Sequence, residues 1–172
     1  MTRAILAAVT VAGVGLIAAP SAFDPPPLLV WNASASAPLG LYRIEAASNL
    51  TVGDLVLVAP TDDVAALLAE RGALAPGVPL LKRMVARAGQ TVCRMEERIL
   101  VDGQAVATAR DADRLGRPLP RWSGCLRLDP GVVFLLNRDA PDSLDGRYFG
   151  PTPAGAVQGR AIPLWTSMER RS

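Results

Sequence analysis

Short apolar runs separated by Gly, Pro, Asn and Asp recur along the chain, and this pattern predicts a mostly β domain. The sequence around Asp102-Gly103 has apolar residues on both sides of a dipeptide typical of a two-residue hairpin turn. Polar residues punctuate the other runs at intervals suited to turns. The predicted strands are Gly40–Ile44, Leu55–Val58, Leu80–Val85, the hairpin Ile99–Val106, and Gly131–Leu136.

One internal segment follows helical spacing. Thr61 precedes two acidic residues, apolar positions continue through 64–71, and Gly72 follows, which together indicate a helix with an N-cap, early negative charge and a glycine stop. The stretch 107–123 is polar and contains proline, so it is predicted to be a surface insertion. The fold class is therefore mostly β with one helix in the domain.

The N-terminal segment, residues 1–22, is predicted to direct export. Arg3 precedes the uncharged run Ala4–Ala19, and a positive residue before an apolar run favours a cytoplasmic N-terminus and translocation of the rest. The run is shorter than the roughly 20 residues of a spanning helix, and small residues suited to signal-peptide cleavage follow it. The run lacks a polar face, which argues against a buried core helix. Both a retained anchor and a cleaved signal peptide fit this pattern.

Residues 23–31 follow as a Pro-rich apolar linker. Three consecutive prolines, Pro25 to Pro27, end any helix and leave the chain extended. Leu28–Trp31 is interpreted as a first core strand or as a patch resting on the membrane surface, where tryptophan is favoured. Residues 32–168 then form one domain, large enough to bury a core.

Composition narrows the function. Half the residues are apolar, which excludes a disordered chain. The net charge of +2 is spread along the chain without a basic run, so nucleic acid is not an expected partner. With no histidine and two cysteines, neither a metal site nor a cofactor is expected. Export would place Cys93 and Cys125 in an oxidising compartment, where they form one disulfide or remain two buried thiols.

The absence of histidine also limits the chemistry available to a serine nucleophile. Such a serine needs a base, and arginine does not release its proton in proteins. Lys82 is the only lysine; it lies between apolar pairs, and strand spacing places it opposite Arg83. To act as a base, Lys82 needs a pKa of about 8, and lowering it that far by burial costs about 3 kcal/mol. A serine hydrolase with this sequence must therefore be a Ser-Lys enzyme.

Three segments resemble the type I signal peptidases. They are Asn32–Tyr42, which contains Ser36 before Ala-Pro; the strand around Lys82; and Asn137–Pro151, with its Asn-Arg-Asp and Ser-x-Asp-x-Arg-Tyr-x-Gly elements. The short chain, the Asn-x-Ser-x-Ser-x-Pro-x-Gly-x-Tyr form and the single N-terminal segment are most similar to the TraF branch. Those enzymes are peptidases of conjugative plasmids that mature the pilus subunit. The resemblance covers most of residues 30–165 and implies a signal-peptidase-like β domain.

The resemblance also implies roles for individual residues. Asn137 and Asp139 would shape their loop, although Leu135-Leu136 replaces the family's usual Gly-Asp and leaves the loop geometry open. The site residues implied are Ser36 as nucleophile, Lys82 as general base, Ser34 as oxyanion donor beside the Ser36 amide, Ser143 as the residue orienting the lysine, and Asp145 with Arg147 as a supporting ion pair.

The implied function is cleavage of an exported precursor, a conjugative pilin, after small residues at the periplasmic face of the inner membrane. Expected partners are that precursor, the inner membrane and other conjugative transfer or type IV secretion components. Hydrolysis and pilin cyclisation remain equally compatible with the sequence. The alternatives are a general type I signal peptidase and a non-enzymatic scaffold in a conjugative secretion complex. A Ser-Lys self-cleaving repressor is disfavoured by the export segment.

Overall fold

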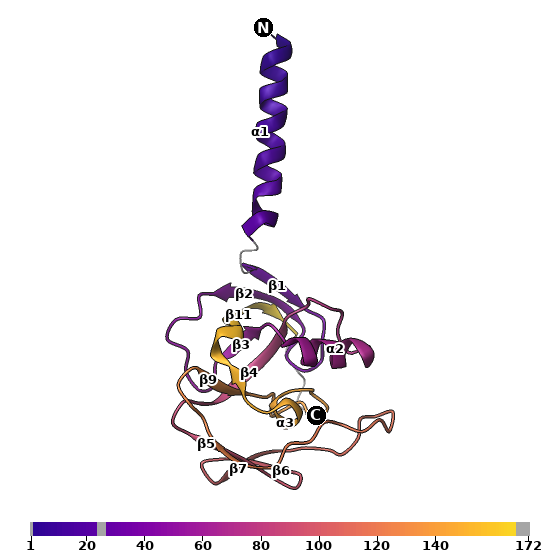
Figure 1. Cartoon of the computed structure of the whole chain (residues 1–172), viewed down its shortest axis with the longest axis vertical. Helices are drawn as coiled ribbons and strands as arrows, with labels where there is room; N and C mark the ends of the chain where they lie inside the picture. Colours follow the sequence, from indigo (N-terminus) through magenta and orange to yellow (C-terminus); the bar gives the residue numbers. More distant parts are fainter. Residues whose placement is uncertain (1, 24–26, 168–172) are drawn as a thin grey trace.

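The computed structural model describes residues 2–23 and 27–167. Helix α1 (Thr2–Phe23) extends away from a β-sheet body that contains the remaining elements (Figure 1). Among the described residues, no helix is both long and apolar enough to cross a membrane. Part of the predicted linker, residues 24–26, and the predicted domain end at residue 168 lie outside the described residues.

A seven-stranded antiparallel sheet forms the larger part of the body and carries the predicted site residue Lys82. β4 lies between β3 and β9 near one end of the sheet, so Lys82 is on an interior strand. The last strand of the domain lies among the first ones in this sheet, because β11 pairs with both β2 and β3. In spatial order the strands are β1 (Leu29–Asn32), β2 (Gly40–Glu45), β11 (Val157–Thr166), β3 (Leu55–Val58), β4 (Leu80–Arg87), β9 (Val132–Leu135) and β10 (Thr152–Pro153).

A second antiparallel sheet of four strands lies at the end of the body opposite α1 (Figure 1). The predicted hairpin forms its edge strand β7 and the neighbouring β6, and Asp102 and Gly103 both have positive φ, as an Asp-Gly turn of this type requires. Cys93 and Cys125 lie directly opposite each other on neighbouring strands and form a disulfide. The strands in order are β7 (Gln104–Thr108), β6 (Arg98–Val101), β5 (Thr91–Met95) and β8 (Gly124–Arg127).

Three apolar clusters fill the body, and one of them connects the two sheets. Phe134 and Leu136 from the large sheet pack with Val92 and Ile99 from the small one. Helix α2 (Asp62–Glu70) buries Leu68 and has Asp62 and Asp63 in its first turn, as predicted. Its N-cap, Thr61, makes no capping hydrogen bond through its side chain.

The mostly β fold class predicted from the sequence is confirmed, and the predicted strands and helix are present with small shifts of their ends. Residues 28–31 are predicted to be a first core strand or a patch on the membrane surface. Leu29–Asn32 is a strand, β1, at the edge of the sheet, and it is not part of the core because Leu29 and Trp31 are exposed. The prediction omits β5, β8, β10 and β11. It also omits the four-residue helix α3 (Gly146–Phe149), which begins directly after Asp145, the acidic residue of the predicted ion pair.

The predicted surface insertion, residues 107–123, is mostly exposed but is attached to the body at several points. Ala109 is buried, and the Trp122 ring packs against Phe134 while its Nε1–H donates to the Gly146 carbonyl at 3.0 Å. These contacts hold the insertion against the loop that carries Ser143. The insertion is therefore one wall of the candidate site as well as a surface feature.

Candidate active site

Ser36 lies in a tight turn between β1 and β2, and the buried side chain of Asn32 holds this turn in place. The Asn32 amide nitrogen donates to the carbonyl oxygens of Ser34, Ala37 and Pro38, each at 3.0 Å. Its amide oxygen accepts the Ser34 backbone N–H at 3.1 Å. Among the described residues, these backbone groups of the turn have no strand-to-strand hydrogen bonds, and the Asn32 side chain supplies partners for them. Asn32 thereby fixes the segment around Ser36.

The two predicted serines of this turn contact each other. The Ser34 hydroxyl donates to the Asn32 amide oxygen at 3.1 Å, and the Ser34 and Ser36 hydroxyl oxygens are 3.0 Å apart. Because Ser34 has a single hydroxyl proton, its bond to Asn32 leaves Ser36 as the donor in the serine pair. In this arrangement the Ser36 proton points towards Ser34.

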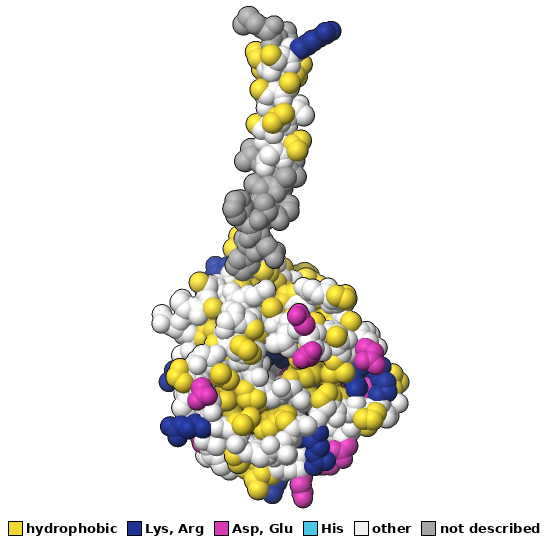
Figure 2. All heavy atoms as spheres, viewed as in Figure 1, with side chains coloured by type: hydrophobic (Ala, Val, Ile, Leu, Met, Phe, Trp, Pro, Cys, Tyr) yellow, Lys and Arg dark blue, Asp and Glu magenta, His cyan; other side chains and the backbone are white. Residues whose placement is uncertain are grey.

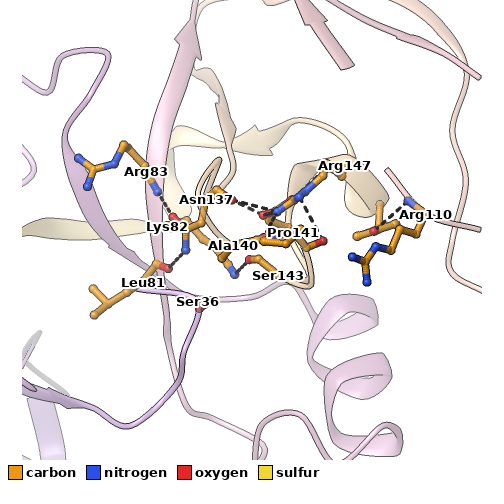
Figure 3. A network of polar contacts seen from close by, with 12 residues as sticks. Ser36, Leu81, Lys82, Arg83, Arg110, Asn137, Ala140, Pro141, Ser143 and Arg147 are labelled. Carbon is orange, nitrogen blue, oxygen red and sulfur yellow. Dashed lines mark hydrogen bonds and ion pairs between the residues drawn. The ribbon is translucent and has the colours of Figure 1, made fainter. Parts of the chain in front are cut away.

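Lys82 is buried in the middle of β4, and Arg83 beside it is exposed, as strand alternation predicts. The Lys82 ammonium nitrogen donates to the Ser143 hydroxyl at 2.7 Å (Figure 3). Asn137 holds the backbone on both sides of Lys82: its amide nitrogen donates to Leu81 O, and its amide oxygen accepts Arg83 N–H, both at 3.0 Å. The lysine therefore has a fixed backbone and a defined side-chain partner.

Burial lowers the pKa of Lys82 from 10.5 to about 8. Loss of hydration is the main cause; the negative charge of Asp145 opposes it, and the positive charge of Arg147 adds to it. A pKa of about 8, lowered by burial, is the value that Lys82 needs to act as a base, and Arg147 rather than the neighbouring Arg83 supplies the like-charge repulsion. The shift corresponds to about 3 kcal/mol of stability that the folded protein forgoes at neutral pH.

Asp145 and Arg147 form a buried ion pair behind the site. Arg147 Nε and Nη2 donate to the two Asp145 oxygens at 2.9 and 2.8 Å, and both side chains are almost wholly buried. Arg147 Nη2 also donates to the carbonyls of Asn137 and Ala140, and Asp145 accepts the Asn137 backbone N–H. Burial opposes the Arg147 charge, but the hydrogen bond and charge of Asp145 raise its pKa overall. This pair fixes the loop from Asn137 to Ser143 (Figure 3).

Gly146 lets α3 and the ion pair approach the sheet. A Cβ atom at this position would lie 2.7 Å from the Leu135 carbonyl oxygen and 2.9 Å from the Phe134 ring. Real Cβ contacts are not this short, so another residue would push α3 away from β9. The glycine between Asp145 and Arg147 thereby allows both side chains to be buried beneath the loop.

Ser36 and Ser143 line the same cavity, which has a volume of about 540 Å³. Lys82 contacts Ser143 directly, so Ser143 connects the lysine to the cavity that Ser36 lines, and no hydrogen bond joins Lys82 to Ser36 among the described residues (Figure 3). A smaller cavity of about 80 Å³ also borders Ser36, between the serine turn and the loop that begins at Asn137.

Sequence reasoning gave no role to Asn32, although it begins the quoted motif. The role of Asn32 could have been predicted from its position beside a turn that contains a proline, since an asparagine amide can bind several turn carbonyls. Asn137 was expected to shape its loop, and the contacts around Lys82 add a direct link to the β4 backbone. Asp139 lines both cavities and makes no side-chain hydrogen bond among the described residues.

Comparison with known proteins gives matches over most of the chain. The family model described as signal peptidase, peptidase S26, matches residues 1–165. The conjugal transfer protein TraF of Agrobacterium fabrum is 37% identical over 147 residues, which cover 78% of this chain and 81% of that protein. The probable conjugal transfer protein TraF of Sinorhizobium fredii is 36% identical over 177 residues, with 94% and 87% covered. A plasmid transfer protein TraF of Escherichia coli is 31% identical over 149 residues, with 78% and 81% covered.

Among solved structures, a signal peptidase I from Enterococcus faecalis matches with a TM-score of 0.38 and 18% identity. The match covers 66% of this chain and 97% of that one. The family assignment depends on the sequence matches, which extend through the serine turn, the strand with Lys82 and the loop with the buried ion pair. The chain belongs to the signal peptidase family, peptidase S26, as a protein of the TraF type.

Proposed function

We propose that this protein is a membrane-associated serine endopeptidase with a Ser36-Lys82 dyad, which cleaves an exported conjugative pilin precursor after small residues. The observation that carries the proposal is the buried Lys82 amine, with a pKa of about 8, bonded to a serine that shares a cavity with Ser36. The family and the conjugal-transfer relatives support a peptidase that acts in conjugation.

In the proposed reaction, neutral Lys82 takes the proton of Ser36 as Oγ attacks the peptide carbonyl carbon. The resulting ammonium gives this proton to the departing amine, and Ser36 keeps the acyl group as an ester. Water then attacks the ester while Lys82 takes one of its protons, and Lys82 passes this proton to Ser36 Oγ as the acyl–oxygen bond breaks and the acid product leaves. A neutral amine has one lone pair and two N–H donors; the bond to Ser143 uses one donor and leaves the lone pair free to turn towards Ser36. Ser143 is thus a positioning residue.

The carbonyl oxygen becomes an oxyanion during the attack and needs donors. We assign this role to the Ser36 backbone N–H and the Ser34 hydroxyl, which lies 3.0 Å from Ser36 Oγ. The Ser34 proton faces Asn32 in the structure, so substrate binding must turn it towards the oxyanion, while the Ser36 proton turns towards Lys82.

Ser34→Ala is expected to lower kcat by about 10²–10³, the usual loss for one oxyanion donor, with little change in KM. Ser48→Ala, at an exposed serine outside the site, is the control and should retain wild-type kinetics. Steady-state kinetics on a peptide substrate measure both constants. A rise in KM at unchanged kcat would show that Ser34 only shapes the turn.

An apolar surface supports membrane association. We define the tryptophan patch as Leu28, Leu29, Trp31, Leu164 and Trp165, all of which are exposed. Trp31 and Trp165 both lie opposite Leu41 on β2, with ring centroids 6.1 Å apart. β1 is the strand that follows α1, and hydrophobic side chains cover much of the nearby face of the body (Figure 2). Tryptophan is favoured at membrane interfaces, so we place this end of the body against the periplasmic face of the inner membrane.

The activity of the dyad should depend on pH through Lys82. Because burial lowers its pKa to about 8, the amine is mostly protonated at pH 7, and kcat/KM is expected to rise with pH around pH 8 and then level off. Leu80 and Lys82 line a third cavity, of about 70 Å³, so Leu80→Glu would place a negative charge nearby, raise the lysine pKa and move the midpoint to higher pH. Rates between pH 6 and about 10 measure the midpoint.

Leu80→Gln is the matched control for this pH experiment, because it introduces similar size and polarity without charge. Its midpoint should stay closer to that of the wild type than the midpoint of Leu80→Glu. Identical midpoints in wild type and a folded Leu80→Glu variant would count against Lys82 as the titrating base.

The proposed function is tested by mass spectrometry of a pilin precursor co-expressed with this protein. Wild type should convert the precursor to a product cut after a small residue, and Ser36→Ala should leave it intact. The product mass also separates hydrolysis from cyclisation, because a linear product is heavier than the cyclic one by one water. Persistence of the intact precursor beside folded wild-type protein would contradict the proposal.

A further inference from the structure

The larger cavity has a distinct composition at the end away from Ser36. Four arginines and three aspartates line it, and the arginines come from the end of α2 and from the insertion 107–123. Asp113 forms ion pairs with Arg71 and Arg117, and Asp142 forms ion pairs with Arg110 and Arg114. Each aspartate is thus shared by two guanidinium groups, so each cluster keeps one positive charge without a carboxylate partner. The third aspartate, Asp139, lies at the Ser36 end, where it also lines the smaller cavity.

Two of these arginines are accessible and have free donors. The Arg114 and Arg110 side chains are 79% and 49% exposed, and in the described part of the chain each donates only to Asp142. A guanidinium has five N–H donors, so both can bind a second oxygen-rich group. The positive surroundings also lower the pKa of Asp142, chiefly through its hydrogen bond from Arg114. Asp142 precedes Ser143 in the chain, so the two arginines that bind Asp142 lie close to the serine that contacts Lys82.

Arg71 adds a buried donor to the same wall. Its side chain is about nine-tenths buried, and it binds Asp113 and the Pro118 carbonyl. Its Nε–H has no hydrogen-bond partner among the described residues. A buried guanidinium donor without an acceptor is costly, and an added oxygen acceptor would remove that cost. Stability alone does not account for the pairs of Arg110 and Arg114 with Asp142, since exposed ion pairs contribute only about 0–1 kcal/mol.

The position of the arginines relative to Ser36 indicates which part of a substrate they meet. Two cavities border Ser36: the small one, formed with the loop that begins at Asn137, and the arginine-lined one. The small cavity suits the small residue before the scissile bond, so the segment after that bond enters the larger cavity. This placement rests on the proposed endopeptidase function.

We propose that the arginines of the larger cavity, Arg110 and Arg114 above all, form a specificity subsite for a carboxylate in the substrate segment that follows the cleaved bond. An acidic side chain and a free C-terminal carboxylate are the two sources of this group. Both accept the paired N–H donors that guanidinium presents in a plane.

The test uses matched peptides with one alanine-rich cleavage sequence. One pair has Glu or Gln after the cleavage site, a second pair has Glu or Gln before it, and a third ends in a free carboxylate or an amide close after the site. Wild type is expected to favour the carboxylate after the site by roughly tenfold in kcat/KM, mainly through KM, and to lose the preference at high salt. The acid–amide pair shows which source of carboxylate is used.

Arg110→Gln/Arg114→Gln should reduce the ratio of kcat/KM for the Glu peptide over the Gln peptide to about twofold or less, because the accessible guanidinium groups are gone. Arg127→Gln removes one positive charge from an exposed position on β8 outside the cavity, and it should keep the full preference. In Arg114→Glu the preference should reverse towards a peptide with Lys after the site. This reversal distinguishes direct recognition from a general effect of net charge.

The outcomes separate this inference from the proposed function. Cleavage of every peptide with no preference for a carboxylate after the site, or an equal preference in the double variant, would overturn the subsite and leave the endopeptidase intact. A preference confined to Glu before the site would also overturn it. Failure to cleave any peptide, under conditions where the protein is folded, would instead contradict the proposed function.

Discussion

Replacing Lys82 by methionine is expected to abolish precursor processing while making the protein more stable. The variant loses the proposed base, and the loss should exceed about 10⁴-fold because serine and base act as one unit. Methionine has a similar length but no charge to bury, so the variant should recover up to about 3 kcal/mol of unfolding free energy at pH 7. Urea unfolding and precursor processing, measured on the same preparation, check both effects.

Ser36→Ala is the matched control for this experiment. It should be as inactive as Lys82→Met, because it removes the proposed nucleophile, but it should leave stability close to wild type since Ser36 contributes only one exposed hydrogen bond. The stability gain of Lys82→Met should also shrink between pH 8 and about 10.5, where the unfolded lysine loses its proton too. Residual processing by either variant near the wild-type rate would disprove the dyad.

Arg147→Met is expected to destabilise the domain by about 3–5 kcal/mol, because it leaves the Asp145 carboxylate buried without its positive partner. It also removes the donors to the carbonyls of Asn137 and Ala140. The measurement is the free energy of unfolding in urea. Arg43→Met provides a control at an exposed ion pair with Glu45 and should cost less than about 1 kcal/mol.

The double variant Asp145→Asn/Arg147→Met separates the ion pair from the rest of the network. It should be less destabilised than the sum of the two single variants, since no uncompensated charge remains buried. If Arg147→Met costs no more than Arg43→Met, the pair does not support the loop as described.

The sequence predicts the parts of the fold where local patterns are strong. The hairpin at Asp102-Gly103 and the helix after Thr61 are examples, because a turn dipeptide and a run of charges and apolar residues define them locally. β8 was missed because its four residues are all exposed, so they have no apolar alternation. β11 was missed because its partners β2 and β3 lie about a hundred residues earlier, and a single sequence does not reveal such pairing.

In the candidate site, too, features that depend on residue type were predicted, and features that depend on long-range contacts were not. The absence of histidine leaves the single lysine, Lys82, as the candidate base, and the resemblance to the signal peptidases implies Ser36 as the nucleophile. Burial on a strand predicts the low lysine pKa. Residue types alone do not reveal that the Asn32 amide reaches three carbonyls or that Asn137 flanks Lys82 on the β4 backbone. The same holds for the arginine-lined wall, because it depends on how the insertion folds back towards Ser143.

The buried lysine has a further consequence, since its chemistry exists only in the finished fold. At pH 7 an amine with a pKa of about 8 is neutral in roughly one molecule in ten, whereas an unfolded lysine is neutral in about one in three thousand. A chain emerging unfolded from an export channel would therefore carry an almost inert Ser36. Folding itself would switch on the protease, so that a nascent or damaged copy poses little risk to neighbouring chains.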